Sequence, residues 1–196
     1  MRGKVTSISG ATVCVDLRGL QLYDRVYVGH KRLSGEVVHL EKEHTTVQVF
    51  EDTHGLSVGE PAEGTRSALT VMLGPGLLGE IFDGLQRPLS TLRQMSGDFI
   101  RETHEASSLD LQRQWNFSAE KQAGTQVAVG ELLGKIDEGH LSHPIYSRIA
   151  GEIAQIANGP NRLEQPLATF TDGQLQYAWQ NWSVRRPRCG GHKRPA

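Results

Sequence analysis

In the first seventy residues, apolar and polar side chains alternate with a period of two. Turn-forming residues interrupt the alternation at short intervals, as at Ser9-Gly10, Ser34-Gly35 and His54-Gly55. A period of two directs one face of each strand inward and the other outward. The connections are too short for the crossover helices of a parallel sheet. The pattern therefore predicts a small antiparallel β-barrel over residues 1–72. Its alternating apolar positions are Val13/Val15/Leu17, Val26/Val28, Val47/Val49 and Leu69/Val71/Leu73.

The charge of the chain is nearly balanced, which bears on the partners to expect. Its 196 residues include 21 Lys and Arg against 22 Asp and Glu, a formal net charge of −1. A barrel that binds nucleic acid is expected to show a basic groove with stacking aromatic side chains. The stretch 44–63 instead holds four carboxylates and no Lys or Arg. We therefore expect no nucleic-acid partner.

Neither a membrane span nor a secreted disulfide framework is predicted. No apolar run approaches the roughly 20 residues that a spanning helix needs. The first six residues, MRGKVT, lack the apolar stretch of a signal peptide. Cys14 and Cys189 lie far apart and form no motif. We expect a cytoplasmic location and no direct membrane insertion.

Residues 73–109 are interpreted as a glycine hinge and a helical linker. Gly74 to Gly79 read G-x-G-x-x-G, and the spacing of Leu77, Ile81 and Leu85 predicts a helix that ends at Arg87-Pro88. The positions Leu89/Leu92/Met95 continue the helical spacing. A dinucleotide site needs a parallel β-α-β unit and an acidic residue after the second strand. The pattern before the glycines is antiparallel, and no strand precedes Asp98, so a redirecting turn is favoured over a cofactor loop.

Residues 110–186 are predicted to form a second β-rich module. The string Gly130-Glu131-Leu132-Leu133 is echoed by Gly151-Glu152-Ile153-Ala154. This echo suits two interlocking hairpins that share one core, as in the barrel-sandwich domains that carry biotin or lipoate. Those carriers hold a modified lysine between the halves, whereas residues 137–144 contain none. The flanking aromatics, Trp115/Phe117 and Tyr177/Trp179/Trp182, are interpreted as sealing the core of the module.

No pattern in the chain predicts catalytic, cofactor-binding or metal-binding residues. Residues 130–136 resemble a phosphate-binding loop but have three residues between the glycines and Ile136 where a hydroxyl is required. His140 and His143 lack a third ligand and read as solvated loop residues. The adjacent carboxylates Glu51/Asp52 and Asp137/Glu138 should point to opposite faces of a strand, which makes poor acid–base pairs. Residues 187–196 are basic and predicted to be disordered.

The string LTVMLGPGLLGEIFDGLQRPL, residues 69–89, resembles the segment after the N-terminal barrel in the catalytic A subunit, or alpha chain, of V-type and archaeal-type ATP synthases. That family reads LGPGLL followed by IFDGIQRPL or IYDGIQRPL. Agreement extends to GKVTSISGATVCV, LQLYDRVYVG, LSGEVVHLE and VQVFEDTHGLSVGEP upstream. Downstream, GDFI, WNF and WSVRRPR fit the bulge of the family, although Ser183 stands where the family usually has proline.

The resemblance implies what this region does and what it lacks. In the family the barrel joins those of neighbouring A and B subunits in a ring, and the bulge contacts the peripheral stalk. ATP and magnesium bind in a later domain with a P-loop, and this sequence holds no such motif after the resemblance ends near Arg188. We therefore hypothesise a non-catalytic N-terminal fragment, arising by truncation or frameshift, that is peripheral to the membrane when assembled and able to self-associate. The alternative is a stand-alone β-barrel module that binds nucleic acid or a protein partner.

Overall fold

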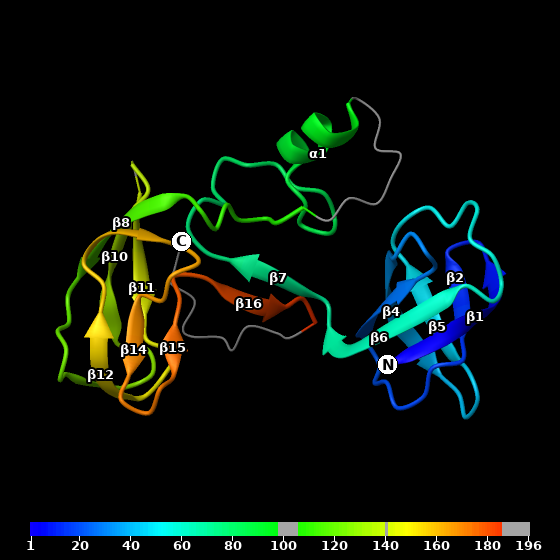
Figure 1. Ribbon diagram of the computed structural model, residues 1–196, viewed down its shortest axis with the longest axis horizontal. Helices are drawn as coiled ribbons and strands as arrows, with labels where there is room; N and C mark the ends of the chain where they lie inside the picture. Colours follow the sequence, from blue (N-terminus) through cyan, green and yellow to red (C-terminus); the bar gives the residue numbers. More distant parts are fainter. Residues whose placement is uncertain (98–105, 140, 186–196) are drawn as a thin grey trace, which may run out of the picture. The chain divides into compact units, whose positions relative to one another are not determined.

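The computed structural model describes residues 1–97, 106–139 and 141–185, and the chain divides into two compact units (Figure 1). The first unit comprises Met1–Val71, Leu92–Glu105 and Trp182–Ala196. The second comprises Met72–Thr91 and Ala106–Asn181. The second unit is thus inserted into the chain path of the first.

Six antiparallel strands close the barrel of the first unit. They are β1 (Arg2–Ser9), β2 (Thr12–Val15), β3 (Asp24–Val28), β4 (Leu33–Leu40), β5 (Thr45–Val49) and β6 (Pro61–Ala68), in the order β1-β2-β5-β4-β3-β6. Val47 of β5 lies opposite Val13 of β2 and Val37 of β4. All three valines are fully buried, so the alternating valines do line the interior and the predicted mainly β fold is confirmed.

The last of the predicted barrel positions lies in another sheet. Strand β7 (Thr70–Leu73) pairs with β16 (Gln180–Ser183) in a two-stranded sheet and not with the barrel. The N–H of Val184 also donates to the carbonyl of Leu69 at 3.0 Å. The Leu69/Val71/Leu73 alternation was therefore a correct strand signal with the wrong partner. The chain crosses from one unit to the other within each of these two strands.

The helix predicted over residues 77–87 is wrong. That stretch forms consecutive turns with a bridge between Phe82 and Pro88, and the helix α1 (Leu89–Ser96) begins only after the proline. Pro88 therefore precedes the helix instead of ending one. Leu78 and Ile81 are 68% and 70% exposed, so the apolar spacing does not form a buried face. The helical spacing at Leu89/Leu92/Met95 is confirmed.

Two four-stranded sheets share the core of the second unit (Figure 1). One has the order β11-β10-β8-β13 and the other β15-β14-β12-β9. The strands are β8 (Gln114–Ala119), β9 (Gln126–Val127), β10 (Leu132–Asp137), β11 (Ser142–Tyr146), β12 (Gly151–Ile156), β13 (Gly159–Arg162), β14 (Ala168–Phe170) and β15 (Leu175–Gln176).

The internal echo of the sequence supplies one strand to each sheet. The first copy leads into β10 and the second forms β12, and their Leu133 and Ile153 are both fully buried in the shared core. Trp115 and Phe117 of β8 are buried in the same core, with Trp179 packed against it. The interpretation that these aromatics seal the module is therefore confirmed for Trp115, Phe117 and Trp179.

Within the described ranges, no helix has both the length and the apolar character to cross a bilayer.

Candidate functional site

The glycine loop at residues 74–79 already holds an anion, and that anion is a side chain of the protein. The N–H of Gly76 donates to Oε2 of Glu138 at 3.0 Å. The Glu138 side chain is only 7% exposed, and its Oε1 lies 2.8 Å from Nδ1 of His143. A phosphate bound to this loop would have to displace a buried carboxylate from the Gly76 amide. The geometry supports the interpretation of a structural turn.

Packing explains why glycine occupies two positions of this loop. Gly76 has a φ of +96°, and a Cβ there would lie 3.0 Å from Cζ2 of Trp115. A Cβ at Gly74 would lie 2.7 Å from Cβ of Trp179. Any larger side chain at these positions would therefore push against the aromatic side chains of the core.

His143 is more constrained than the sequence predicted. It is paired with Glu138 and its side chain is only one-third exposed, so the interpretation as a solvated loop residue is wrong for this histidine. His140, the other half of the motif, lies outside the described residues. Over residues 1–97, 106–139 and 141–185, no cluster of three or more His, Cys, Asp or Glu could hold a metal ion.

The adjacent carboxylates do not converge on a common site. Glu51 accepts the N–H of Ser34 at 2.8 Å, while its neighbour Asp52 accepts that of His54 at 2.9 Å. Asp137 accepts the N–H of Gly139, whereas Glu138 contacts Gly76 and His143. Each carboxylate thus fixes a different piece of backbone.

The string FDGLQRPL, residues 82–89, forms a closed loop around Asp83. Its Oδ1 accepts the N–H groups of Leu85 and Arg87, and its Oδ2 accepts Nε of Arg87 at 2.7 Å. Partial burial raises the pKa of Asp83, but the hydrogen bonds from Arg87 and Leu85 outweigh burial and leave that pKa below its usual value. The motif is therefore a self-contained turn held by a carboxylate–guanidinium pair.

Gln86 ties this loop to the strand β7. Its Oε1 accepts the N–H of Met72 and its Nε2 donates to the Met72 carbonyl, both at 2.7 Å. The side-chain amide thus pairs with Met72 as a neighbouring strand would. Gln86 reaches this position with a φ of +60°, which is unusual for a residue other than glycine. Sequence reasoning did not find this role, and no local spacing signals it.

One cavity of about 590 Å³ lies beside these loops in the second unit. Small hydroxyl side chains line it together with the charged Glu80, Asp110 and Arg113. The guanidinium of Arg113 stacks over the ring of Trp115 at 4.1 Å. Asp110 caps the turn before β8 by accepting the N–H groups of Gln112 and Arg113. The cavity therefore presents polar groups that already serve the turn around it.

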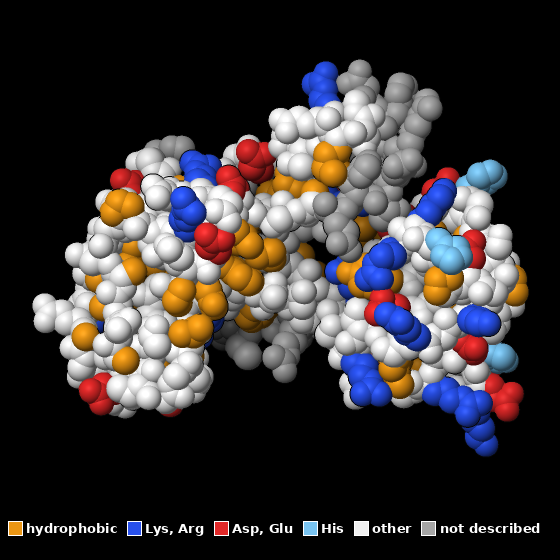
Figure 2. Space-filling model, in the orientation of Figure 1, with side chains coloured by type: hydrophobic (Ala, Val, Ile, Leu, Met, Phe, Trp, Pro, Cys, Tyr) orange, Lys and Arg blue, Asp and Glu red, His pale blue; other side chains and the backbone are white. Residues whose placement is uncertain are grey.

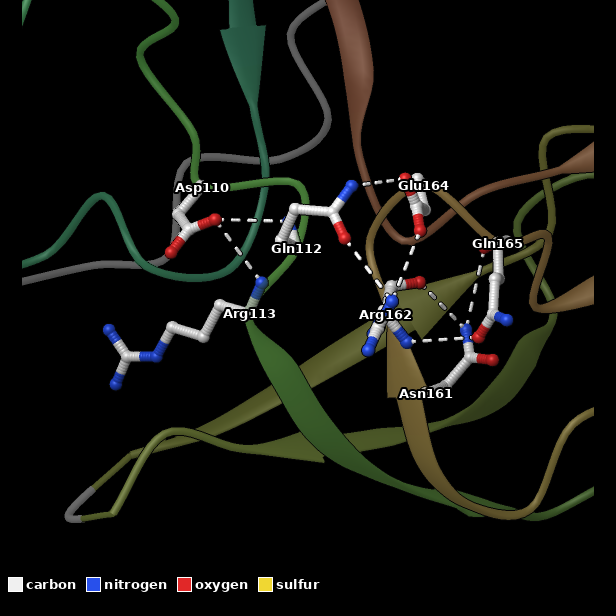
Figure 3. A network of polar contacts seen from close by, with 7 residues as sticks. All are labelled: Asp110, Gln112, Arg113, Asn161, Arg162, Glu164 and Gln165. Atoms are coloured by element: carbon white, nitrogen blue, oxygen red, sulfur yellow. Dashed lines mark hydrogen bonds and ion pairs between the residues drawn. The ribbon is translucent and has the colours of Figure 1, made fainter.

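A polar network continues from this turn across strand β13 (Figure 3). Gln112 donates to Glu164 and accepts from Nη1 of Arg162 at 3.2 Å, and Arg162 also pairs with Glu164 at 3.7 Å. Asn161 donates to the carbonyls of Arg162 and Gln165. These side chains are exposed and satisfy one another, as in a structural surface network.

The outer face of the barrel carries an aromatic ring between two guanidinium groups. Those of Arg25 and Arg32 lie 4.5 Å and 4.3 Å from the ring centroid of Tyr27. Arg32 also pairs with Glu63 at 2.6 Å. Figure 2 shows Lys and Arg side chains interspersed with carboxylates and apolar side chains on the barrel. The face is mixed in charge, which suits protein contact better than an extended phosphate backbone.

Comparisons with known proteins place both units in one family. Residues 5–66 match the model described as ATP synthase alpha/beta family, beta-barrel domain. Residues 106–185 match the model described as the barrel-sandwich domain of the ATPsynthase alpha/beta subunit. The two matches follow the order of the two units along the chain.

Curated relatives agree over nearly the whole chain. The second A subunit of the A-type ATP synthase of Methanospirillum hungatei is 40% identical over 189 residues, which is 95% of this chain and 32% of the relative. The V-type ATP synthase alpha chain of Anaeromyxobacter dehalogenans is 38% identical over 199 residues, covering 100% of this chain and 34% of the relative. The A subunit of the A-type ATP synthase of Methanopyrus kandleri is 37% identical over 96% of this chain and 33% of the relative.

The chain therefore spans about a third of the length of these relatives. It carries two domains of the family in sequence, and each has its own core in the structure. The protein belongs to the ATP synthase alpha/beta family, with the A subunits of A-type and the alpha chains of V-type ATP synthases as its relatives.

Proposed function

We propose that this chain acts in the assembly of an A-type or V-type ATP synthase head and takes no part in its chemistry. The barrel contacts a neighbouring B subunit, and the two-sheet module contacts the peripheral stalk. The complex as a whole couples ATP synthesis or hydrolysis to proton or sodium transport. The matching order of two family domains, over 95% or more of the chain in the relatives named above, carries this proposal.

Exposed apolar side chains on each unit support a role in contact. Val58 and Phe50 on the barrel are 63% and 42% exposed, and Val129 on the two-sheet module is 66% exposed. Large apolar side chains that remain in solvent are candidates for burial against a partner. They also favour self-association of the isolated chain, which gel filtration at two concentrations would reveal.

Reciprocal substitutions test the assignment of one partner to each unit. Phe50→Glu and Val58→Glu should weaken co-purification with the B subunit, while Val129→Glu should leave it unchanged. Val129→Glu should instead weaken binding to the stalk subunits. Each variant is the control for the other, because all three introduce one carboxylate at an exposed site. Failure of the unaltered chain to bind either partner would refute the proposal.

The chemical part of the proposal is tested separately. Phosphoryl transfer requires backbone amides and a lysine around the phosphates, with a magnesium ion. The glycine loop at residues 74–79 directs its Gly76 amide to Glu138. We expect the isolated chain to show no heat of binding for magnesium ATP in calorimetry and no turnover. Saturable ATP binding by this chain would contradict that expectation.

A further inference from the structure

A buried carboxylate on the outside of the barrel takes its charged partner from the far end of the chain. The Glu36 side chain is only 5% exposed although its strand β4 lies at the barrel surface. Its Oε2 accepts Nε of Arg185 at 3.1 Å, and its Oε1 accepts Nη2 of the same guanidinium. This two-pronged contact joins residues 149 positions apart within the first unit.

The cation nearest in the sheet does not serve Glu36. Arg25 lies directly opposite Glu36 in the β3–β4 register. Its Nε donates instead to Oγ of Ser34 at 3.1 Å, and its guanidinium stacks on Tyr27. Within the part of the chain that the structure describes, both hydrogen bonds to the Glu36 carboxylate come from Arg185. Without Arg185 the carboxylate would be a buried charge without a counter-ion, which is strongly unfavourable.

An aromatic ring completes the surroundings of the Arg185 guanidinium. The guanidinium carbon lies 4.7 Å from the ring centroid of Tyr23. Tyr23 has a φ of +71°, and its N–H donates to the Val37 carbonyl at 2.8 Å. Strand β4 therefore holds both Glu36 and the backbone of Tyr23. An ion pair on one side and a ring on the other is a favourable combination for a planar guanidinium.

We propose that Glu36 and Tyr23 form a guanidinium-binding site on the barrel, and that Arg185 occupies it in cis. The occupied site anchors the chain where it returns from the second unit, next to the Val184–Leu69 hydrogen bond. It is independent of any partner protein, so it goes beyond the proposed function. Its ligand class is an arginine side chain: the two-pronged acceptor and the ring select a planar guanidinium over the ammonium of lysine.

Hydrogen exchange at Val184 tests the anchor. Its amide is hydrogen-bonded to Leu69, so protection reports on local opening of the returning segment. Arg185→Ala should speed exchange of this amide by about tenfold or more, the size expected for a lost charged hydrogen bond. Arg32→Ala removes the exposed barrel pair with Glu63 and should leave Val184 exchange unchanged. Equal exchange in wild type and Arg185→Ala would overturn the proposal.

A double-mutant cycle separates a direct pair from two independent effects. Glu36→Gln should speed Val184 exchange as Arg185→Ala does, and the double variant should exchange no faster than either single variant. Additive effects would contradict a shared site. Tyr23→Leu keeps Glu36 and should give a smaller increase, so the cycle remains informative if Glu36→Gln folds poorly.

Rescue with a small molecule tests the ligand class. N-acetyl-argininamide added to Arg185→Ala should shift the NMR signals of the Tyr23 ring. The neutral citrulline analogue and the lysine analogue should shift them less, and Glu36→Gln/Arg185→Ala should not respond. A response to citrulline equal to that to arginine would show that no guanidinium site exists.

Discussion

The two units build their cores from different side chains. Among the described residues, eight of the twelve buried apolar residues in the barrel core are valine, whereas the core of the two-sheet module has one valine among thirteen. That second core is built around Phe117, Phe170 and Trp115, with isoleucine and leucine between them. Both units arise from the same alternation of apolar and polar positions, so the alternation alone does not decide the architecture.

The volume of the inward side chains distinguishes the two cases. A closed barrel of few strands has a narrow interior, which short β-branched side chains fill without strain. Two stacked sheets lie about 10 Å apart and need longer side chains to fill the space between them. The Val13, Val37 and Val47 positions across three strands illustrate the first solution. Phe117, beneath the glycine at 134, illustrates the second.

The largest effect is expected when the long side chain of the two-sheet module is removed. Phe117→Ala should lower the free energy of unfolding of that unit by about 3–5 kcal/mol, because the ring is 1% exposed and leaves a cavity. Fluorescence of Trp115 and Trp179 during urea unfolding would measure it. Tyr146→Ala, at a 52% exposed position of β11, is the matched control and should change stability little. A loss under about 1 kcal/mol for Phe117→Ala would mean that the core collapses around the cavity.

A smaller loss is expected from the corresponding change in the barrel. Val47→Ala should cost about 2 kcal/mol, because it removes two buried methyl groups and a narrow barrel cannot close the gap. Hydrogen exchange of the β2 and β5 amides would detect it without tryptophan. Val58→Ala, at a 63% exposed site of the same unit, should be nearly neutral. If Val47→Ala matched Phe117→Ala, side-chain length would not be the difference between the two cores.

Local pattern predicted the strands well, because period-two alternation is a property of each strand by itself. It did not predict the partner of β7, since Val71 and Leu73 alternate in the same way whether they face a barrel or β16. It failed over residues 77–87, where Leu77, Ile81 and Leu85 have helical spacing by coincidence. Turns around Gly79 and Asp83 take precedence there, because their hydrogen bonds satisfy the backbone without a helix.

The contacts that hold the characteristic loops join distant residues and so escape local reasoning. Gly76 and Glu138 are 62 positions apart, and Glu36 and Arg185 are 149 apart. The sequence identified the glycine loop correctly as a turn, but nothing near it indicates that a carboxylate from the hairpin after β10 satisfies its amide. A polar residue that acts at long range looks like any surface residue until the fold brings its partner close.

Buried polar ties give a third comparison between the units. Gln86→Leu removes both hydrogen bonds to Met72 and should destabilise the second unit by about 1–3 kcal/mol, since the Met72 amide and carbonyl lose their partners. The barrel counterpart is Thr45→Val, which removes the 2.6 Å hydrogen bond from a buried hydroxyl to the Leu17 carbonyl. Urea unfolding with both probes would compare them. An unchanged midpoint for Gln86→Leu would show that water replaces the amide at Met72.

The smallest effect is expected at Asp83 and depends on pH. The pKa of this carboxyl is lowered in the folded chain, because hydrogen bonds from Arg87 and Leu85 outweigh the opposing effect of burial. A lowered folded-state pKa contributes stability above the unfolded value of about 4, and that contribution is lost as the pH falls through the folded value. Asp83→Asn should therefore cost about 1 kcal/mol at pH 7 and progressively less below pH 4. Urea unfolding of both proteins at pH 7, 5 and 3, followed by tryptophan fluorescence, would measure the convergence. Parallel stability curves would mean that the Asp83–Arg87 pair acts through its shape alone, and that the loop depends on its backbone turns as the barrel depends on its packing.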